Sequence, residues 1–378
     1  MTDPMVVPTP PSPTVSAPRF IMTLATVLVA ILVLLGVDAG LARVDKKETR
    51  SVAVIEYQVG TRLMAMGRVR DGIDHLRTAA SLDRDKPAYT AALAEAVLAE
   101  GRPLDAEQLL IPLLEREQRD GAANLAMARV LAKQGRIEEA KSYYHTAIFG
   151  LWPEDAERNR TASRFELIDF LAATGAKHEL LSELLPIQDA YPDDTLMRKR
   201  IAQLFVVAGS PTKAGEIFRD VLRHNSNDTS AYIGLANAAM AQGNYPDARG
   251  YYQSAQKLAP DDTAIRSRIK LADSATAIDP TQRGLPLPEQ LQRSRNLVQM
   301  TIASARKCLN AEAPQVAAAL DSVSRSLMVQ SSAIPRNQAI EENLSLAGAM
   351  WRMRGGRCAT RAPNVDEALA LVQDKIAQ

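Results

Sequence analysis

The stretch that decides the fold is GRVRDGIDHLRTAASLDRDKP, from Gly67 to Pro87. It begins with a glycine, carries apolar residues at helical spacing and ends in a charged turn closed by a proline. Apolar side chains three and four residues apart lie on one face of a helix. The stretch is therefore either one amphipathic helix among many or one copy of a repeated unit, and the rest of the chain distinguishes the two.

Glycines in the same local context recur along the chain. Similar stretches begin at Gly67, Gly101, Gly135, Gly175, Gly209 and Gly243, at intervals of 34, 34, 40, 34 and 34 residues. A period of 34 is typical of a helix–turn–helix repeat. The interval of 40 is one period plus six residues, and we place the extra residues in the stretch IFGLWPEDAERNR, which has the composition of a loop.

The copies also share a pattern of small and large residues. A small residue follows the glycine by five positions at Gly72, Ala106, Ala140, Ala214 and Ala248, and a large one follows four further on at Leu76, Leu110, Tyr144, Leu184, Phe218 and Tyr252. Small residues allow two helices to cross closely, and the large residue fills the space beside them. Leu180 and Ile168 break the pattern in the fourth copy, which we expect to be the least regular.

On these residues, the segment 53–262 resembles the tetratricopeptide repeat. The resemblance implies an all-α fold, a right-handed α-solenoid of about six helix–turn–helix units, in which stacked hairpins share one core. We expect the solenoid to cover residues 53–277, with 263–277 as a solvated capping helix.

The N-terminal region predicts a tail and a membrane anchor. Residues 1–18 contain six prolines and almost no charge, so we expect a disordered tail. Phe20 to Val37 is an uncharged run of 18 residues, and with its flanks it predicts a transmembrane helix over 19–42. A cleavable signal peptide, with small residues near Gly40–Ala42, and a buried core helix are the alternatives.

After a Pro- and Gly-rich break at 278–288, the pattern predicts a C-terminal helical bundle over 286–378. Four helices are expected: one from Pro288 to about Leu309, one in APQVAAALDSVSRSLMVQ, one ending before Gly355 and one capped by Asn364. The cysteines, Cys308 and Cys358, end up at the same end of an up-down-up bundle, where a disulfide is geometrically feasible.

Two observations conflict on the location of the large domain. The basic residues that follow the apolar run, Arg43, Lys46, Lys47 and Arg50, favour a cytoplasmic domain. A Cys308–Cys358 disulfide requires an oxidising compartment. Because long domains translocate largely regardless of charge, we expect a single-pass membrane protein whose soluble domain lies outside the cytoplasmic membrane, in the periplasm or an equivalent compartment.

Composition and motifs argue against several classes of function. The net charge of +1 does not suit a nucleic-acid-binding surface. The chain contains no GxxxxGK[ST], HExxH, GxSxG or CxxC motif, and the four histidines, His75, His145, His178 and His224, are scattered among the repeats. We therefore predict no enzyme activity, no cofactor and no metal site.

The resemblance implies that the first helix of each repeat lines a concave groove that binds a peptide or protein segment. By register, the groove positions are Tyr57, Thr61, Glu95, Leu125, Arg129, Lys133, Phe165, Asp169, Lys199, Gln203, Ile233 and Asn237. Arg129, Lys133, Lys199 and Asn237 are candidates for a clamp on a terminal carboxylate. That set is incomplete and Asp169 lies among it, so a mixed apolar and polar groove is the better expectation.

The sequence thus predicts a membrane-anchored scaffold or adaptor that binds a protein partner. The alternative is an enzyme, or a regulatory subunit of one, with its activity tied to the C-terminal helical region. Self-association through the ends of the solenoid is a third hypothesis.

Overall fold

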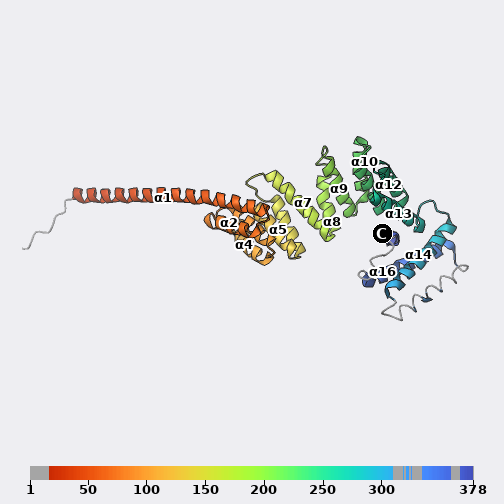
Figure 1. The fold of residues 1–378 in the computed structure, drawn as a ribbon. Helices are drawn as coiled ribbons and strands as arrows, with labels where there is room; N and C mark the ends of the chain where they lie inside the picture. The colour runs from red at the N-terminus through yellow and green to blue at the C-terminus, as the bar shows by residue number, and fades with distance from the viewer. Residues whose placement is uncertain are drawn as a thin grey trace, which may run out of the picture. The chain divides into compact units, whose positions relative to one another are not determined.

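The computed structural model describes residues 17–309, 318, 321, 322, 325, 334–358 and 367–377. In this part of the chain the regular elements are helices, with one isolated bridge between Asp120 and Leu151. The contacts divide the chain into two compact units, Met1–Leu167 and Ile168–Gln378. The helices follow one another as hairpins in both units (Figure 1).

The first unit contains the first three predicted repeats. Its hairpins are α1 (Ala17–Ala65) with α2 (Val69–Leu82), α3 (Pro87–Ala99) with α4 (Pro103–Arg116), and α5 (Gly121–Lys133) with α6 (Ile137–Phe149). In this unit α2 and α4 also pack against the next first helices, α3 and α5, and consecutive first helices contact one another. This is the stacked arrangement that the 34-residue period predicts.

The repeat glycines form the turns inside the hairpins. All six have a positive φ, between 67° and 88°. After α5, the amide of Gly135 donates to the carbonyl of Ala132 and the amide of Arg136 donates to the carbonyl of Leu131. This 6→1 bond defines a Schellman turn, which requires a left-handed residue at the position that glycine occupies without strain. The predicted role of these glycines is confirmed.

Aspartates cap the first helices of several repeats. The carboxylate of Asp120 accepts a hydrogen bond from the amide of Ala123, and Asp194, Asp228 and Asp262 do the same at α9, α11 and α13. Each carboxylate satisfies an amide that has no partner within its helix. In these repeats, the charged turn at the end of one repeat therefore also starts the helix that follows.

The long interval contains a loop, residues 150–155, between α6 and α7 (Ala156–Thr174), but most of its extra length lies in α7, which has 19 residues against 13 in α5. Leu151 pairs with the chain before α5, accepting from the amide of Gly121 at 2.8 Å. The Trp152 ring lies directly over Gly121, where an added Cβ would come within 2.3 Å of it, and its indole nitrogen donates to the carbonyl of Ala147. The predicted loop is present, and it is held in place.

The second unit begins within α7, in the repeat that the sequence predicts to be the least regular. It continues with α8 (Lys177–Leu184), the 3₁₀ turn η1 (Leu185–Ile187), α9 (Thr195–Val207), α10 (Pro211–His224), α11 (Thr229–Ala241), α12 (Tyr245–Leu258) and α13 (Thr263–Ile278). The C-terminal helices are α14 (Leu287–Leu309), α16 (Arg336–Cys358) and α17 (Glu367–Ala377). The predicted helix ending before Gly355 extends to Cys358, since two glycines only weaken a helix.

The last repeat and the C-terminal helices share one core. Tyr252 of α12, Ala272 of α13, Leu297 of α14, Met350 of α16 and Leu369 of α17 belong to a single buried cluster. The expectation of a solvated capping helix is therefore wrong: α13 packs against α17 and buries Ile265, Ala272 and Ala275. The physical reason is that its small and apolar residues recur on one face, which a further helix covers.

Several sequence predictions fall outside the described part of the chain. These are the tail up to residue 16, most of the helix expected between α14 and α16, the cap at Asn364, and the side chains of Cys308 and Cys358. The segment 19–42 lies in α1, where the side chains of most residues are also not described. Among the residues that are described, no helix combines the length and hydropathy needed to cross a membrane.

Candidate functional site

An ionic row crosses the first helices of three repeats in the first unit. Arg129 of α5 donates through Nε to Glu166 of α7 at 2.8 Å, and its second amino group bonds the other carboxylate oxygen at 2.5 Å. Its third nitrogen donates to Glu95 of α3. Glu95 and Arg129, two of the predicted groove residues, therefore contact each other.

The row is only partly open to solvent, which perturbs its ionisation. Burial raises the pKa of Glu95; Arg129 opposes the rise and the carboxylate of Glu166 adds to it. Burial acts to lower the pKa of Arg129, but the two carboxylates hold it above its usual value. The row contains two carboxylates and one guanidinium, so the carboxylates outnumber the cation. Arg129 is the cation that Glu95 and Glu166 share.

Tyrosines flank this row. The Tyr57 ring lies 4.9 Å from that of Tyr89, centroid to centroid, in a tilted arrangement. Burial raises the pKa of Tyr57, and Glu95 adds to the rise. Burial and Glu166 likewise raise the pKa of Tyr144 to about 12. One turn beyond Tyr57, the hydroxyl of Thr61 donates back to the carbonyl of Tyr57. Tyr89 and Tyr144 are buried, each 5% exposed, so half-buried Tyr57 is the ring of these three that reaches the surface beside the charges.

The remaining predicted positions of this unit differ in exposure. Leu125 and Phe165 are buried, at 7% and 8% exposure, and belong to the core. Their positions on the first helices are as predicted, but their side chains are largely withdrawn from the surface. Lys133, at the end of α5, is exposed.

In the second unit, the predicted groove residues are also bonded within the chain. Lys199 of α9 donates to Asp228 at 2.8 Å and to the hydroxyl of Ser230 at 2.7 Å. The hydroxyl of Tyr252 donates to the side-chain oxygen of Asn237. Burial acts to raise the pKa of Asp228, but its hydrogen bonds, led by that from Lys199, lower it overall.

Three other predicted positions lie on the same helices. Asp169 of α7 accepts two hydrogen bonds from Arg200, at 2.7 and 2.8 Å. Gln203 of α9 is exposed, and Ile233 of α11 is half-buried.

The carboxylate clamp loses its basis in this geometry. Two of its four candidates, Arg129 and Lys199, are engaged by Glu166 and Asp228, so their charges already have partners. A bound terminal carboxylate would have to displace these carboxylates. The other expectation, a mixed apolar and polar groove, stays a prediction.

Glu166 and Arg200 are the groove residues that the sequence reasoning missed. Arg129 and Asp169 each lie six residues before a turn glycine, whereas Glu166 and Arg200 each lie nine before the next one. The structure pairs Arg129 with Glu166 and Asp169 with Arg200, so one position contacts the other across consecutive first helices. The sequence does place opposite charges six residues before one turn glycine and nine residues before the next. A comparison by register misses such pairs, because it considers only equivalent positions of successive repeats.

In the described part of the chain, no group of three or more His, Cys, Asp and Glu side chains is arranged to hold a metal. His75 instead lies 2.6 Å from the carboxylate of Glu56, between α2 and α1.

Comparisons with known proteins agree with the repeat. Sequence models of the tetratricopeptide repeat match residues 97–149 and 199–263. DnaJ homolog subfamily C member 3 of Gallus gallus is 23% identical over 191 residues, which are 48% of this chain and 38% of that protein. The chain thus spans well under half of that curated relative.

Solved structures with the same kind of repeat are also similar. The C-terminal part of a TPR repeat-containing protein from Cytophaga hutchinsonii is 13% identical, covers 83% of this chain and 98% of its own, and has a TM-score of 0.42. YrrB, described as a TPR protein with an unusual peptide-binding site, is 16% identical, covers 52% and 97%, and has a TM-score of 0.39. The prediction of tetratricopeptide repeats is confirmed for the two segments that the sequence models match.

Proposed function

We propose that this chain is a membrane-anchored scaffold that holds a protein or peptide segment on the concave face of its repeats. Tetratricopeptide repeats generally mediate protein–protein interaction, and two segments of the chain match them. The observation that carries the proposal is the row of Glu95, Arg129 and Glu166, which crosses three consecutive first helices beside the ring of Tyr57. Aromatic rings and arginine are the groups most enriched at protein interfaces.

The chemistry of this face favours a polar extended segment. The row can accept hydrogen bonds from backbone amides through Glu95 and Glu166, and exposed Lys133 lies one turn beyond Arg129. The ion pairs fix the side chains before binding, which lowers the entropy cost of association.

Site-specific photo-crosslinking in cells tests the groove. A photoreactive amino acid is placed at Thr61 or Lys133 on the concave face, and at Arg77 or Glu138 on the second helices as matched controls. We expect Thr61 and Lys133 to crosslink to the same protein and the controls to give none of that product. Crosslinks that arise only from Arg77 and Glu138 would place the contact on the outer face and refute the groove.

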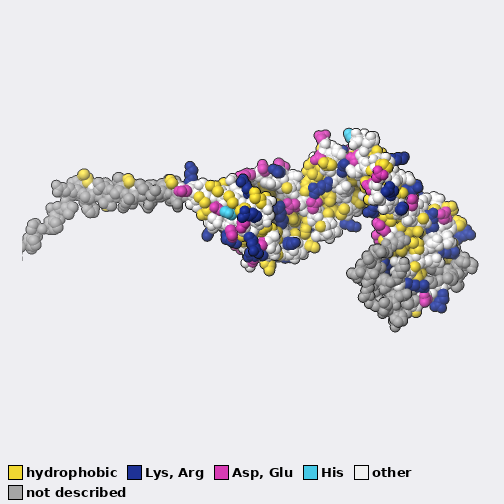
Figure 2. Space-filling view, viewed as in Figure 1, with side chains coloured by type: hydrophobic (Ala, Val, Ile, Leu, Met, Phe, Trp, Pro, Cys, Tyr) yellow, Lys and Arg dark blue, Asp and Glu magenta, His cyan; other side chains and the backbone are white. Residues whose placement is uncertain are grey.

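The membrane anchor is the second part of the proposal. The sequence from Phe20 to Val37 is uncharged, and five apolar side chains described in this stretch, Met22, Leu24, Leu28, Leu32 and Val33, are 58–69% exposed. Isolated hydrophobic side chains stand out along α1 in Figure 2. Transfer of such side chains from water into lipid lowers the free energy. At 49 residues, α1 is about 74 Å long, more than a bilayer requires.

Alkaline extraction of membranes tests the anchor. We expect the full chain to remain in the membrane pellet and a variant without residues 19–42 to appear in the supernatant. A full chain that is released by alkali, or that has lost its first residues by cleavage near Ala42, would overturn this part and favour a peripheral or exported protein.

We also propose that the repeats lie outside the cytoplasmic membrane. The support is the Cys308–Cys358 disulfide, which stays a prediction. The amide of Asn343 on α16 donates to the hydroxyl of Ser294 on α14 at 3.0 Å, an offset of 49 residues, and the two helices have equal lengths. In an up-down-up arrangement, this register brings Cys308 level with the end of α16.

Thiol labelling of unreduced protein, with a reporter fused after Gln378 that is active only when exported, tests the location. Two free thiols with an inactive reporter would place the repeats in the cytoplasm.

A further inference from the structure

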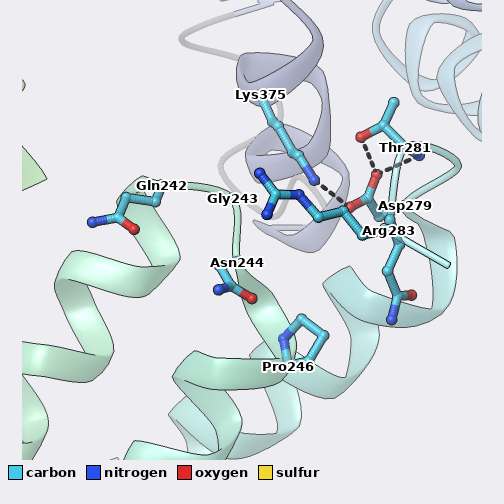
Figure 3. Close-up of a pocket in the computed structure, with 9 residues that line it drawn as sticks. Gln242, Gly243, Asn244, Pro246, Asp279, Thr281, Arg283 and Lys375 are labelled. Atoms are coloured by element: carbon cyan, nitrogen blue, oxygen red, sulfur yellow. Dashed lines mark hydrogen bonds and ion pairs between the residues drawn. The ribbon is translucent and has the colours of Figure 1, made fainter. Parts of the chain in front are cut away.

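The turn at Gly243 in the second unit borders two adjoining cavities. Their volumes are about 520 and 650 Å³, and both are lined by Gln242, Gly243 and Lys375. They lie where this turn meets α17 and the loop that follows α13 (Figure 3). Lys199, Gln203, Ile233 and Asn237, the predicted groove residues of this unit, line neither cavity.

The smaller cavity is polar, and its uncompensated charge is positive. Asp279 is 1% exposed and its carboxylate is fully engaged. One oxygen accepts from the amide and the hydroxyl of Thr281, both at 2.8 Å, and the other accepts from Lys375 at 2.7 Å. Asp279 and Lys375 therefore neutralise each other, so the carboxylate of Asp279 does not repel an anionic ligand.

Arg283 supplies the remaining charge. Its side chain is exposed and makes no ion pair with any residue that the structure describes. It extends across the cavity beside Lys375 and points its guanidinium toward the turn at Gly243 (Figure 3). A guanidinium in this position presents its donors as a planar fork, a geometry that matches a carboxylate.

The larger cavity offers apolar surface next to this charge. Val206, Met240 and Leu371 line it, and the hydroxyl of Tyr245 fixes the backbone of α17 by donating to the carbonyl of Leu371 at 2.9 Å. Lys177 and Asp374, which also line it, carry opposite charges. A ligand that spans both cavities would meet apolar side chains at one end and Arg283 at the other.

We propose that these two cavities bind an extended peptide segment of a partner protein that carries a carboxylate beside an apolar side chain. The carboxylate pairs with Arg283, and the apolar side chain lies against Val206 and Met240. The two cavities are large enough together for several residues of a peptide. Because the predicted groove residues of this unit line neither cavity, this site is distinct from the proposed groove.

Peptide binding to the full chain in detergent tests the inference by fluorescence polarisation. The probes are fluorescein-labelled Gly-Leu-Glu-Leu-Glu-Gly and its analogue with glutamine in place of glutamate. We expect the acidic probe to bind more tightly than the neutral one, and Arg283→Glu to weaken the acidic probe by roughly tenfold or more. The matched control is Arg352→Glu on α16, an exposed arginine that lines neither cavity and should leave the affinity unchanged.

The apolar half has its own variant. Val206→Asp should weaken both probes, with a circular dichroism spectrum that matches the wild type. Equal affinity of the wild type for the two probes, or equal loss in Arg283→Glu and Arg352→Glu, would overturn the proposal. Full displacement of the acidic probe by sodium phosphate alone would show a general anion site and would also overturn it. None of these results bears on crosslinking from Thr61 and Lys133, so the two proposals fail separately.

Discussion

Single small residues set the distance between helices in this protein. Ala140 lies on α6, is fully buried and faces the packing of α6 against α5. Gly234 shows the same constraint on α11, where an added Cβ would lie 2.2 Å from the ring of Phe218. At such positions the neighbouring helix leaves no room for a larger side chain, because protein interiors are close-packed.

We therefore expect Ala140→Leu to lower the free energy of unfolding by about 1–3 kcal/mol through overpacking. The measurement is the midpoint of chemical denaturation followed by helicity. Ser142→Leu on the same helix is the control, since Ser142 is exposed and the added methyl groups meet solvent. If the two variants unfolded at the same midpoint, the register of α6 against α5 would be wrong.

The ionic row predicts a pH-dependent loss of stability in Arg129→Met. Without Arg129, Glu95 faces the carboxylate of Glu166 with no cation between them, so the pKa of Glu95 rises further in the folded state. A raised carboxylate pKa stabilises the folded state below the unfolded pKa, and this contribution is lost as the pH rises through the folded pKa. The variant should lose about 1–2 kcal/mol near neutral pH, allowing for partial exposure, and less in mild acid.

Urea unfolding at neutral and mildly acidic pH measures this effect. The control is Arg77→Met, which removes an exposed pair with Asp74 three residues away on the same helix. It should change stability little, and equally at both pH values. A loss in Arg129→Met that grows toward acidic pH would contradict the assigned sign.

A glycine turn of the same kind joins the two helices of each repeat, but the residues around this turn differ between repeats. A Cβ built on Gly135 has no atom within 4 Å, whereas one on Gly243 lies 2.5–2.9 Å from the methylenes of Lys375. Lys375 also bonds Asp279 and lies 5.5 Å from the ring centroid of Tyr245. The last turn therefore has a second role, because it supports the docking of α17.

We expect Gly135→Ala to cost about 1–2 kcal/mol, the penalty for a positive φ alone. Gly243→Ala should cost more, because it also displaces Lys375 from Asp279, which is left buried without its cation. Thermal unfolding of both variants, alone and in a Lys375→Ala background, separates the two effects. In that background the two substitutions should cost the same; a persistent excess for Gly243→Ala would point to another contact.

At the scale of the whole chain, the repeats and the C-terminal helices are not separable. The buried cluster that contains Tyr252 and Ala272 of the repeats also contains Leu297, Met350 and Leu369 of the C-terminal helices. Removal of these helices would expose the apolar faces of α12 and α13 to water. The break at 278–288 is thus a connection within one packed body rather than a boundary between domains.

A chain that ends at residue 277 should consequently unfold at a lower temperature than the full chain and bind the dye ANS more strongly. Both measurements should be made on the two proteins side by side, with circular dichroism to confirm that the shortened chain is still helical. Unchanged thermal unfolding and no added dye binding would mean that the solenoid ends independently at α13.

The sequence alone determined the local and periodic features of this protein. Six glycines at nearly constant spacing indicated the turns, because glycine adopts the positive φ of such a turn without strain. The alternation of small and large residues indicated which helix faces pack. These features depend on neighbours within one hairpin, which lie within about 34 residues of each other in a repeat of this period.

Only the tertiary structure decided which charged residues meet and where the core continues. Register identified Arg129 but not its partner Glu166, because Arg129 lies six residues before its turn glycine and Glu166 lies nine before the next one. The burial of Asp279 against Lys375 joins residues 96 positions apart, and no periodicity connects them. Ion pairs, cavities and shared cores depend on distances between helices that are remote in sequence, and those distances are set by the packing of all the helices at once.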